Sequence, residues 1–273
     1  MRNEEREMAA KKAAQVIRQK LKIPKSIAPI GLVLGTGWGN VLAVKDSREI
    51  AFSKIPCFES LKALEGHARQ VVFGYLEGKP VTFLRGRVHM NEAPSDPSLA
   101  RMVRLQIEML LQLGAKNLIV TSAVGSLSSI LPVGSIGIVN GFVTLYAPEM
   151  PLWGGEFCSP EDTLDPALRE IALQERGELV AAEVGHVMVR GPFFEGRRYD
   201  KPLLAKSGAG VVGMSILPEA CVAALYSGVR ILALCFITNS AVETHSHEEN
   251  LARAKTASAL LGGYLTRIVT RIS

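Results

Sequence analysis

The sequence predicts an α/β protein: a single domain with a central mixed β-sheet flanked by helices. Apolar, β-branched runs recur along the chain without strict alternation, which is typical of strands that are covered on both faces. Helical patterns separate several of these runs, and the clearest, at 98–113, ends at Gly114 as at a left-handed C-cap. We find no repeat or linker that would divide the 273 residues, so we expect one large α/β core over 1–273.

The elements follow in order along the chain. Residues 1–25 have a charged helical pattern without an apolar signal core, which predicts an N-terminal helix packed on the domain. From Ser246 onward, apolar residues at three- and four-residue spacing predict an amphipathic helix, with Ser246 as N-cap and Glu248 and Glu249 in the first turn. The segment 147–166 is rich in Pro, Gly and acidic residues and predicts one long loop. The predicted strands are 30–34, 71–76, 80–84, 117–122, 136–143, 187–190 and 230–238.

The charge and composition limit the class of protein. A net charge of +5 is compatible with nucleic acid, an anionic membrane or a small phosphate-bearing substrate. Lys and Arg are scattered without interleaved aromatic residues, which argues against nucleic acid, and no apolar run approaches the ~20 residues of a membrane span. The four cysteines lack CxxC spacing, so we expect a reduced, cytoplasmic protein without structural zinc.

Three alternating glycines, Gly35, Gly37 and Gly39, follow the first predicted strand and surround Thr36. Such a turn lets backbone N–H groups gather around an anion, either the pyrophosphate of a dinucleotide or a free phosphate. The dinucleotide fingerprint needs a further glycine where this chain has Asn40, and although Glu49 offers an acidic residue after it, no clear helix leads to that residue. A tight turn without a ligand is the structural alternative.

Two further strand ends carry polar or small residues. On an extended segment Arg87 and His89 share a face and could cradle phosphate, although a solvated charged loop is the alternative. Small residues at 122–126 follow the next strand along the chain. Because ligands of open α/β sheets gather at strand ends, the three segments together predict a site for a phosphate-sized anion. His67, taken alone, is more typical of a structural histidine.

The polar groups of the C-terminal half suit a planar heterocycle. Glu195 follows two aromatic residues that include Phe194, so a ring could stack while the carboxylate accepts its N–H. Met214 and Ser215 supply an apolar surface and a hydroxyl, and Asn239 ends a very apolar strand with an amide that both donates and accepts. Each has a structural interpretation as well: an interface pair, a core methionine, an Asx turn.

His245 and His247 lie two residues apart near carboxylates, but no third ligand with zinc spacing is visible. We therefore expect no metal site, and a histidine that caps the last helix or contacts a hydroxyl instead.

Seven short motifs, in their order along the chain, resemble those of the trimeric purine nucleoside phosphorylase family, which also contains the methylthioadenosine phosphorylases. The resemblance extends from Gly31 to the C-terminal helix. It implies a homotrimer without metal or organic cofactor, with inorganic phosphate as co-substrate, and no binding to nucleic acid or membrane. The motifs lie at 35–39, 66–68, 86–92, 123–125, 191–195, 212–215 and 237–239.

The resemblance also implies roles for individual residues. Asn239, Glu195 and His89 would be catalytic, and the reaction would be phosphate-dependent cleavage of inosine, guanosine and their deoxy forms to a free base and a pentose 1-phosphate. Members that cleave methylthioadenosine usually carry aspartate at the position of Asn239, so the asparagine favours 6-oxopurines. The phosphate ligands would be Thr36, His67, Arg87, His89, the backbone at Ala123, and Ser215. The nucleoside ligands would be Phe194, Glu195, Met214, Asn239 and, at the ribose 5′-hydroxyl, His247.

The chain departs from the family pattern near the sugar. Asn91 stands where a tyrosine is usual, and Ser122 where an asparagine is usual. The segment 144–157 does not reproduce the usual phenylalanine-bearing loop that reaches a neighbouring subunit; Tyr146, Met150 or Trp153 are the candidates to replace it. These departures keep methylthioadenosine or methylthioinosine as alternative substrates. Outside this class, the glycine turn and basic charge leave a non-catalytic nucleotide-binding protein as an alternative.

Overall fold

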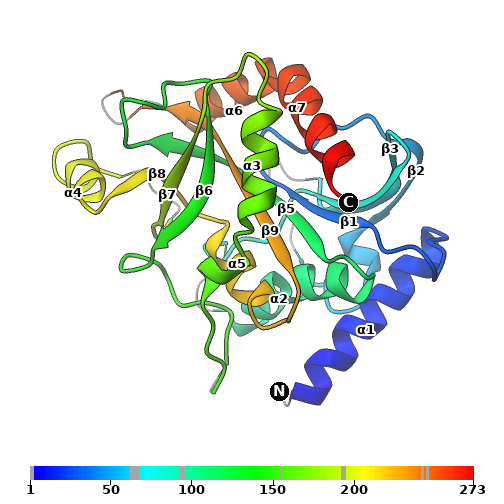
Figure 1. Ribbon diagram of the computed structural model, residues 1–273. Helices are drawn as coiled ribbons and strands as arrows, with labels where there is room; N and C mark the ends of the chain where they lie inside the picture. The colour runs from blue at the N-terminus through cyan, green and yellow to red at the C-terminus, as the bar shows by residue number, and fades with distance from the viewer. Residues whose placement is uncertain are drawn as a thin grey trace.

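A mixed β-sheet forms the centre of the molecule (Figure 1). The computed structural model describes residues 3–61, 68–92, 96–153, 155–191, 195–240, 243 and 246–273. In this part of the chain the sheet has nine strands in the order β2-β3-β4-β1-β5-β8-β7-β6-β9. The strands are β1 (Ile30–Leu34), β2 (Lys45–Ala51), β3 (Gln70–Leu76), β4 (Lys79–Arg85), β5 (Asn117–Ser126), β6 (Ile136–Val143), β7 (Ala181–Met188), β8 (Ala209–Gly213) and β9 (Arg230–Asn239).

The long strand β5 joins an open half of the sheet to a closed half. On one side β5 pairs in parallel with β1, which leads to β4, β3 and β2. On the other side β5 pairs with both β8 and β9, and β9 also pairs with β6, so β5, β8, β7, β6 and β9 close into a ring. Ring closure places the carboxyl ends of β5 and β9 side by side, with Gly125 opposite Asn239.

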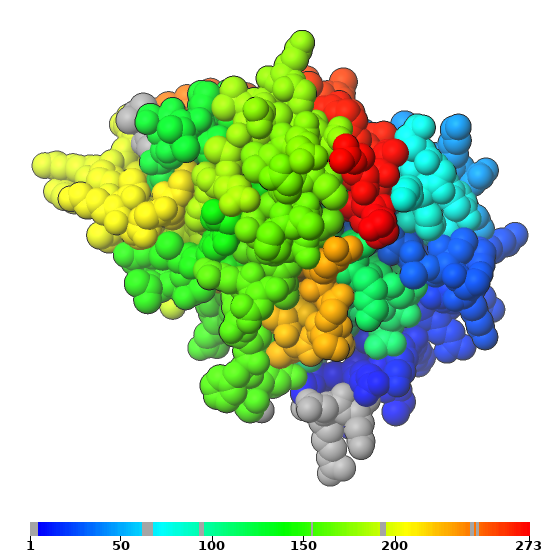
Figure 2. Space-filling model, in the orientation of Figure 1, coloured from blue at the N-terminus to red at the C-terminus, as the bar shows by residue number. Residues whose placement is uncertain are grey.

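Helices cover both faces of the sheet, and α4 lies at the edge of the molecule (Figures 1 and 2). None of the described helices combines the length and apolar character that crossing a membrane requires. The helices are α1 (Asn3–Lys20), α2 (Pro97–Gln112), α3 (Pro166–Gln174), α4 (Asp200–Lys206), α5 (Leu217–Ala223), α6 (His247–Thr256) and α7 (Ser258–Arg271), with 3₁₀ turns η1 (Phe52–Lys54) and η2 (Pro160–Thr163).

Two hydrophobic cores lie on opposite faces of the sheet because successive side chains of a strand point to opposite sides. On β1, Val33 belongs to the core that contains residues of α1, α2 and α5, whereas Leu32 and Leu34 belong to the core of α3 and α7. The whole of β1 is buried, as expected for a parallel strand covered by helices on both faces.

The sequence predicted most of these elements. The strands at 30–34 and 136–143 coincide with β1 and β6, and the helix at 98–113 differs from α2 by one residue at each end. Asp96 caps α2 by accepting from Ser98 N at 2.8 Å. At the head of α6, Ser246 and Glu249 form a reciprocal capping box, which confirms the predicted N-cap.

Two expectations about the elements were wrong, and two strands were missed. The predicted C-terminal helix is two helices, α6 and α7, which meet at Ala257. The strand expected at 187–190 is β7, which begins at Ala181 and ends at Met188. Strands β2 and β8 were not predicted, because β2 is a charged edge strand with mostly exposed side chains and β8 is a five-residue strand with two glycines. Neither offers the apolar run that indicates a buried strand.

One buried titratable group lies within the ring of strands. His186 of β7 is completely buried, with the Phe142 ring edge-on at 6.0 Å between centroids. Among the described residues neither ring nitrogen has a hydrogen-bond partner. Burial disfavours the imidazolium and lowers the pKa of His186 to about 4, from an ordinary value of 6.5.

We expect this histidine to make the fold acid-sensitive. Above pH 6.5 it is neutral in both folded and unfolded chains; as the pH falls from 6.5 towards 4, only the unfolded chain takes up the proton, so stability decreases. Between pH 7.5 and 5 the loss should be about 2 kcal/mol. Urea unfolding of His186→Leu at both pH values should show a smaller decrease than the wild type, while His247→Leu, at an exposed position, should behave like the wild type. An unchanged pH dependence in His186→Leu would contradict this assignment.

Candidate active site

The glycine turn after β1 is fitted closely against β5 and α6. Gly35 N donates to Thr121 Oγ1 at 3.1 Å, and Trp38 Nε1 donates to the Ser122 carbonyl at 3.2 Å. Gly37 has a φ of +82°, and a Cβ added there would lie 2.2 Å from the Cβ of Ala254. The turn therefore requires glycine at position 37 both for its backbone conformation and for its approach to α6.

Arg87 joins two strands and one helix next to this turn. Its guanidinium group is completely buried and donates to Glu219 Oε1 of α5 at 2.5 Å. It also donates to the carbonyl oxygens of Val33 in β1 and Thr121 in β5. These bonds join the end of β1, the middle of β5 and the start of α5, and they place a cation beside Gly35, where an added Cβ would lie 2.8 Å from Arg87 Nη2.

Two hydroxyl groups meet at the same edge of the sheet. Ser122 Oγ and Ser215 Oγ share a hydrogen bond of 2.9 Å, and both side chains are buried. Ile216 follows with φ 77° and ψ −53°, a strained conformation for a β-branched residue. Strain of this kind persists where surrounding structure holds it and is common at ligand sites.

A second ion pair supports the segment that carries His89. Arg69 donates to Glu92 Oε2, and Glu92 Oε1 accepts from the backbone N–H of His89 at 2.7 Å. His89 is half-buried. The pair therefore fixes the backbone turn on which the histidine is carried.

The other part of the site surrounds Asn239. This residue is buried at the end of β9, where its Oδ1 lies 3.1 Å from the Thr238 hydroxyl. A Cβ added at Gly125 would lie 2.8 Å from Asn239 Nδ2, so only glycine leaves room for the amide. Nearby, Asn91 Nδ2 contacts Met214 Sδ at 3.6 Å, and both pack against Gly191.

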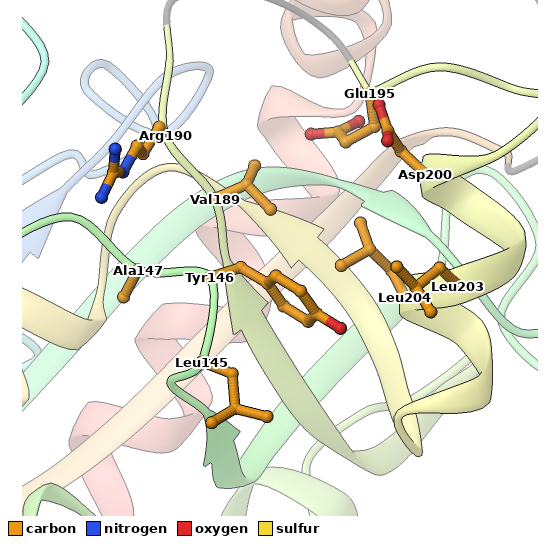
Figure 3. Close-up of a pocket in the computed structure, with 9 residues that line it drawn as sticks. All are labelled: Leu145, Tyr146, Ala147, Val189, Arg190, Glu195, Asp200, Leu203 and Leu204. Carbon is orange, nitrogen blue, oxygen red and sulfur yellow. The ribbon is translucent and has the colours of Figure 1, made fainter.

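Glu195 lies at a cavity of about 380 Å³ between α4 and the segment after β6 (Figure 3). Figure 3 shows its carboxylate near that of Asp200, across the cavity from Arg190 and Tyr146. Burial raises the pKa of the Glu195 carboxyl, while the Lys201 ammonium opposes the rise and Asp200 adds to it. The cavity does not include Asn239, Met214 or Ser215 among its described lining residues, so it adjoins the predicted base site and is not identical with it.

Comparison with known proteins decides the family. The family model described as the phosphorylase superfamily matches residues 29–270. The purine nucleoside phosphorylase of Mycobacterium tuberculosis is 31% identical over 268 residues, 96% of each chain, and purine nucleoside phosphorylase 1 of Geobacillus stearothermophilus is 32% identical over 247 residues, 85% of each. The chain belongs to the purine nucleoside phosphorylase family.

The solved structures agree with the sequence relatives. Schistosoma mansoni purine nucleoside phosphorylase, in a crystal structure with inosine, superposes with a TM-score of 0.82 at 29% identity and covers 97% of each chain. The single α/β domain with a mixed sheet is thus the fold of this family, and the chain is a pentosyltransferase. This membership replaces the non-catalytic alternative that the glycine turn had left open.

The site residues predicted from the sequence lie in different parts of the structure. The structure brings Arg87 and Ser215 together with the turn that carries Thr36, which is half-buried, and with Ala123 of β5. Asn239 of β9 lies beside Gly125, near the carboxyl end of β5. His247 is exposed as the first residue of α6. His67 and Phe194 lie outside the described residues.

The long loop after β6 is attached to this chain's own helices through Trp153. The indole lies between the guanidinium groups of Arg6 and Arg104, at 4.8 and 5.0 Å from its centroid. Glu156 pairs with both arginines, at 3.2 and 2.6 Å. Of the three candidates for reaching a neighbour, Trp153 is therefore engaged within its own chain, whereas Phe157, which we did not predict, is 92% exposed.

Sequence reasoning also missed two charged residues that organise the site. Glu219 stands in the apolar stretch Leu217–Ala223, and a lone carboxylate in such a stretch was an available signal for a buried ion pair. Lys201 stands in a segment crowded with charges, so its burial gave no local signal. In the described part of the chain no three His, Cys, Asp or Glu side chains are grouped to hold a metal ion.

We expect Gly35→Ala to disturb the site, because the new methyl group would meet the Thr121 carbonyl at 2.5 Å and Arg87 Nη2 at 2.8 Å. The loss should be about 1–3 kcal/mol in urea unfolding, accompanied by lower phosphorolytic activity. Gly39→Ala is the matched control, since its Cβ would make only an ordinary 3.4 Å contact with Arg85. Equal behaviour of the two variants would show that the close packing at Gly35 is unimportant.

Proposed function

We propose that this purine nucleoside phosphorylase homologue cleaves 6-oxopurine nucleosides with phosphate, yielding hypoxanthine or guanine and (deoxy)ribose 1-phosphate. The observation that carries the proposal is the buried Asn239 amide, which stands against Gly125 at the joined ends of β5 and β9. The Nδ2 group of an amide at this place can donate hydrogen bonds to O6 and N7 of a purine, both of which are acceptors.

The phosphate would bind at the neighbouring strand ends. The glycine turn, the Arg87 cation and the Ser122–Ser215 hydroxyl pair surround one region, which suits a phosphate anion. There the phosphate would attack C1′ as the glycosidic bond breaks, and its negative charge would stabilise the oxocarbenium-like transition state. His89 would assist from the turn that Glu92 holds.

The departing purine would gain negative charge, and Asn239 would stabilise it through N7 and O6. Because this charge exists mainly in the transition state, the interaction would accelerate the reaction and not merely bind substrate.

Glu195 would accept the N1–H that a 6-oxopurine has and adenine lacks, so adenosine would leave buried groups unpaired. The Schistosoma relative has been crystallised with inosine, guanosine and adenosine, so such relatives do not by themselves select the base.

The direct test is to incubate the protein with inosine, guanosine and adenosine, with and without phosphate, and to measure free base. Phosphate-dependent release from inosine or guanosine would support the proposal. Absence of release from every purine nucleoside would reject it.

Asn239→Asp should shift the preference towards 6-aminopurines, because a carboxyl group can pair with the amino donor of adenine whereas it loses the donor to O6. We expect kcat/KM for inosine to fall roughly 100- to 1000-fold, as for loss of one transition-state donor of about 3–4 kcal/mol. The ratio of inosine to adenosine kcat/KM measures the shift. Unchanged base selectivity would show that Asn239 is not the discriminator.

A second substrate class is favoured by the contact between Asn91 and Met214. The Asn91 amide packs against the thioether at 3.6 Å and next to Gly191, so it is engaged with protein. This leaves the 5′ position of the sugar less defined by polar groups, and methylthioinosine or methylthioadenosine becomes the alternative substrate. Faster turnover of either compound than of inosine would favour this alternative.

The remaining proposals concern assembly and setting. We propose a cytoplasmic homotrimer that takes part in purine salvage, uses phosphate as co-substrate and needs no metal or organic cofactor. The exposed Phe157 on the long loop supports an interface there. Light scattering on the purified protein tests the trimer, for which three chains of 29.4 kDa are expected.

A further inference from the structure

Lys201 is a buried lysine on a helix at the edge of the molecule. Helix α4 lies at the periphery (Figures 1 and 2), and its other lysine, Lys206, is exposed as expected. Lys201 is nevertheless only 3% exposed. Because burying an ammonium group is costly, such a lysine needs compensating partners.

The first partner of Lys201 is the backbone next to Asn239. Lys201 Nζ donates to the Ser240 carbonyl oxygen at 3.3 Å. Two further charged groups hold the same short stretch: Glu243 Oε1 accepts from Ser240 N at 2.8 Å, and Arg253 donates to the Thr238 carbonyl at 2.5 Å. Peptide groups on both sides of Asn239 are thus held by ionic side chains, and Lys201 is the one that arrives from α4.

The second group that Lys201 faces belongs to Glu195, six residues earlier in the chain: the carbonyl of the next residue, Gly196, accepts from Lys201 N at 3.0 Å, and the Lys201 and Glu195 side chains attract each other electrostatically. Desolvation lowers the pKa of Lys201, while Glu195 and Glu243 favour its charged form and Arg197 opposes it. Around Glu195, the charged neighbours are Lys201 and Asp200, with Arg190 across the cavity. Lys201 therefore bonds to the strand end that carries the amide and interacts by charge with the carboxylate.

We propose that Lys201 is the positioning residue of the base site: its ammonium group supplies the counter-charge for Glu195 and holds the backbone carbonyl of Ser240, the residue after Asn239. The inference rests on the proposed function, in which Glu195 must be a carboxylate to accept the purine N1–H. Helix α4 then acts on both base-binding groups through Lys201. It keeps the Glu195 carboxylate, which accepts the purine N1–H, ionised, and it holds the Asn239 amide, which binds N7 and O6, in place.

The experiment compares Lys201→Met, which removes the charge and the donor, with Lys201→Gln, which removes the charge and keeps an N–H donor. Lys206→Met is the matched control on the exposed face of α4. The first measurement is the pH profile of kcat/KM for inosine. In both Lys201 variants the acid limb should move up by about one pH unit or more, with a roughly tenfold loss of kcat/KM at pH 6.

Glu195→Gln separates this role from a purely structural one. In that background the acid limb attributed to Glu195 should be absent, and Lys201→Gln should cause no further shift. Equal loss of activity by the Lys201 variants at every pH, with the acid limb unmoved, would overturn the proposal and leave Lys201 a structural residue.

A second measurement does not depend on turnover. With ¹³C-labelled glutamate, the Glu195 carboxyl resonance, assigned by its loss in Glu195→Gln, titrates directly by NMR. Lys201→Gln should raise the Glu195 pKa by about one unit or more, and Lys206→Met should leave it in place. A wild type that cleaves no purine nucleoside would reject the proposed function, whereas an unmoved Glu195 pKa in folded Lys201→Gln would reject the role of Lys201.

Discussion

The buried Arg87 guanidinium group links two strands and a helix that are far apart in the sequence. It pairs with Glu219 of α5 and donates to the carbonyl oxygens of Val33 in β1 and Thr121 in β5, entirely out of contact with solvent. Removing one member of such a pair leaves an uncompensated buried charge, which costs about 3–5 kcal/mol. The glycine turn after β1 and the hydroxyl of Ser215 before α5 both depend on the spacing that this pair sets.

Closure of the strand ring makes the other half of the site. Because β9 pairs with β5 as well as β6, Asn239 is brought against Gly125, and the amide occupies space that any side chain at position 125 would fill. The polar groups near Asn239 come from different elements: Thr238 from the same strand, Arg253 from α6 and Lys201 from α4. A packed sheet thus supplies a rigid platform on which separate helices fix one amide.

Several features of this region are individually unfavourable for stability. Ile216 has a left-handed backbone conformation, His186 is buried without a hydrogen-bond partner among the described residues, and Lys201 is a buried ammonium group. All three lie on or next to the segments that form the site. Local conflicts of this kind are expected at functional sites, where the surrounding fold compensates for them.

The sequence by itself determined the α/β class, the places of most strands, the glycine that ends α2, the N-cap of α6, and the motifs that point to phosphate and purine. These depend on local spacing and residue chemistry, which a linear sequence contains. It did not show β2 or β8, the division of the last helix at Ala257, the Arg87–Glu219 pair or the burial of Lys201. Those features arise from contacts between segments distant in the chain: Arg87 and Glu219 are 132 residues apart, and only closure of the ring brings α4 against the end of β9. Tertiary structure decided them because the free energy of a buried charge depends on which partners the fold brings to it.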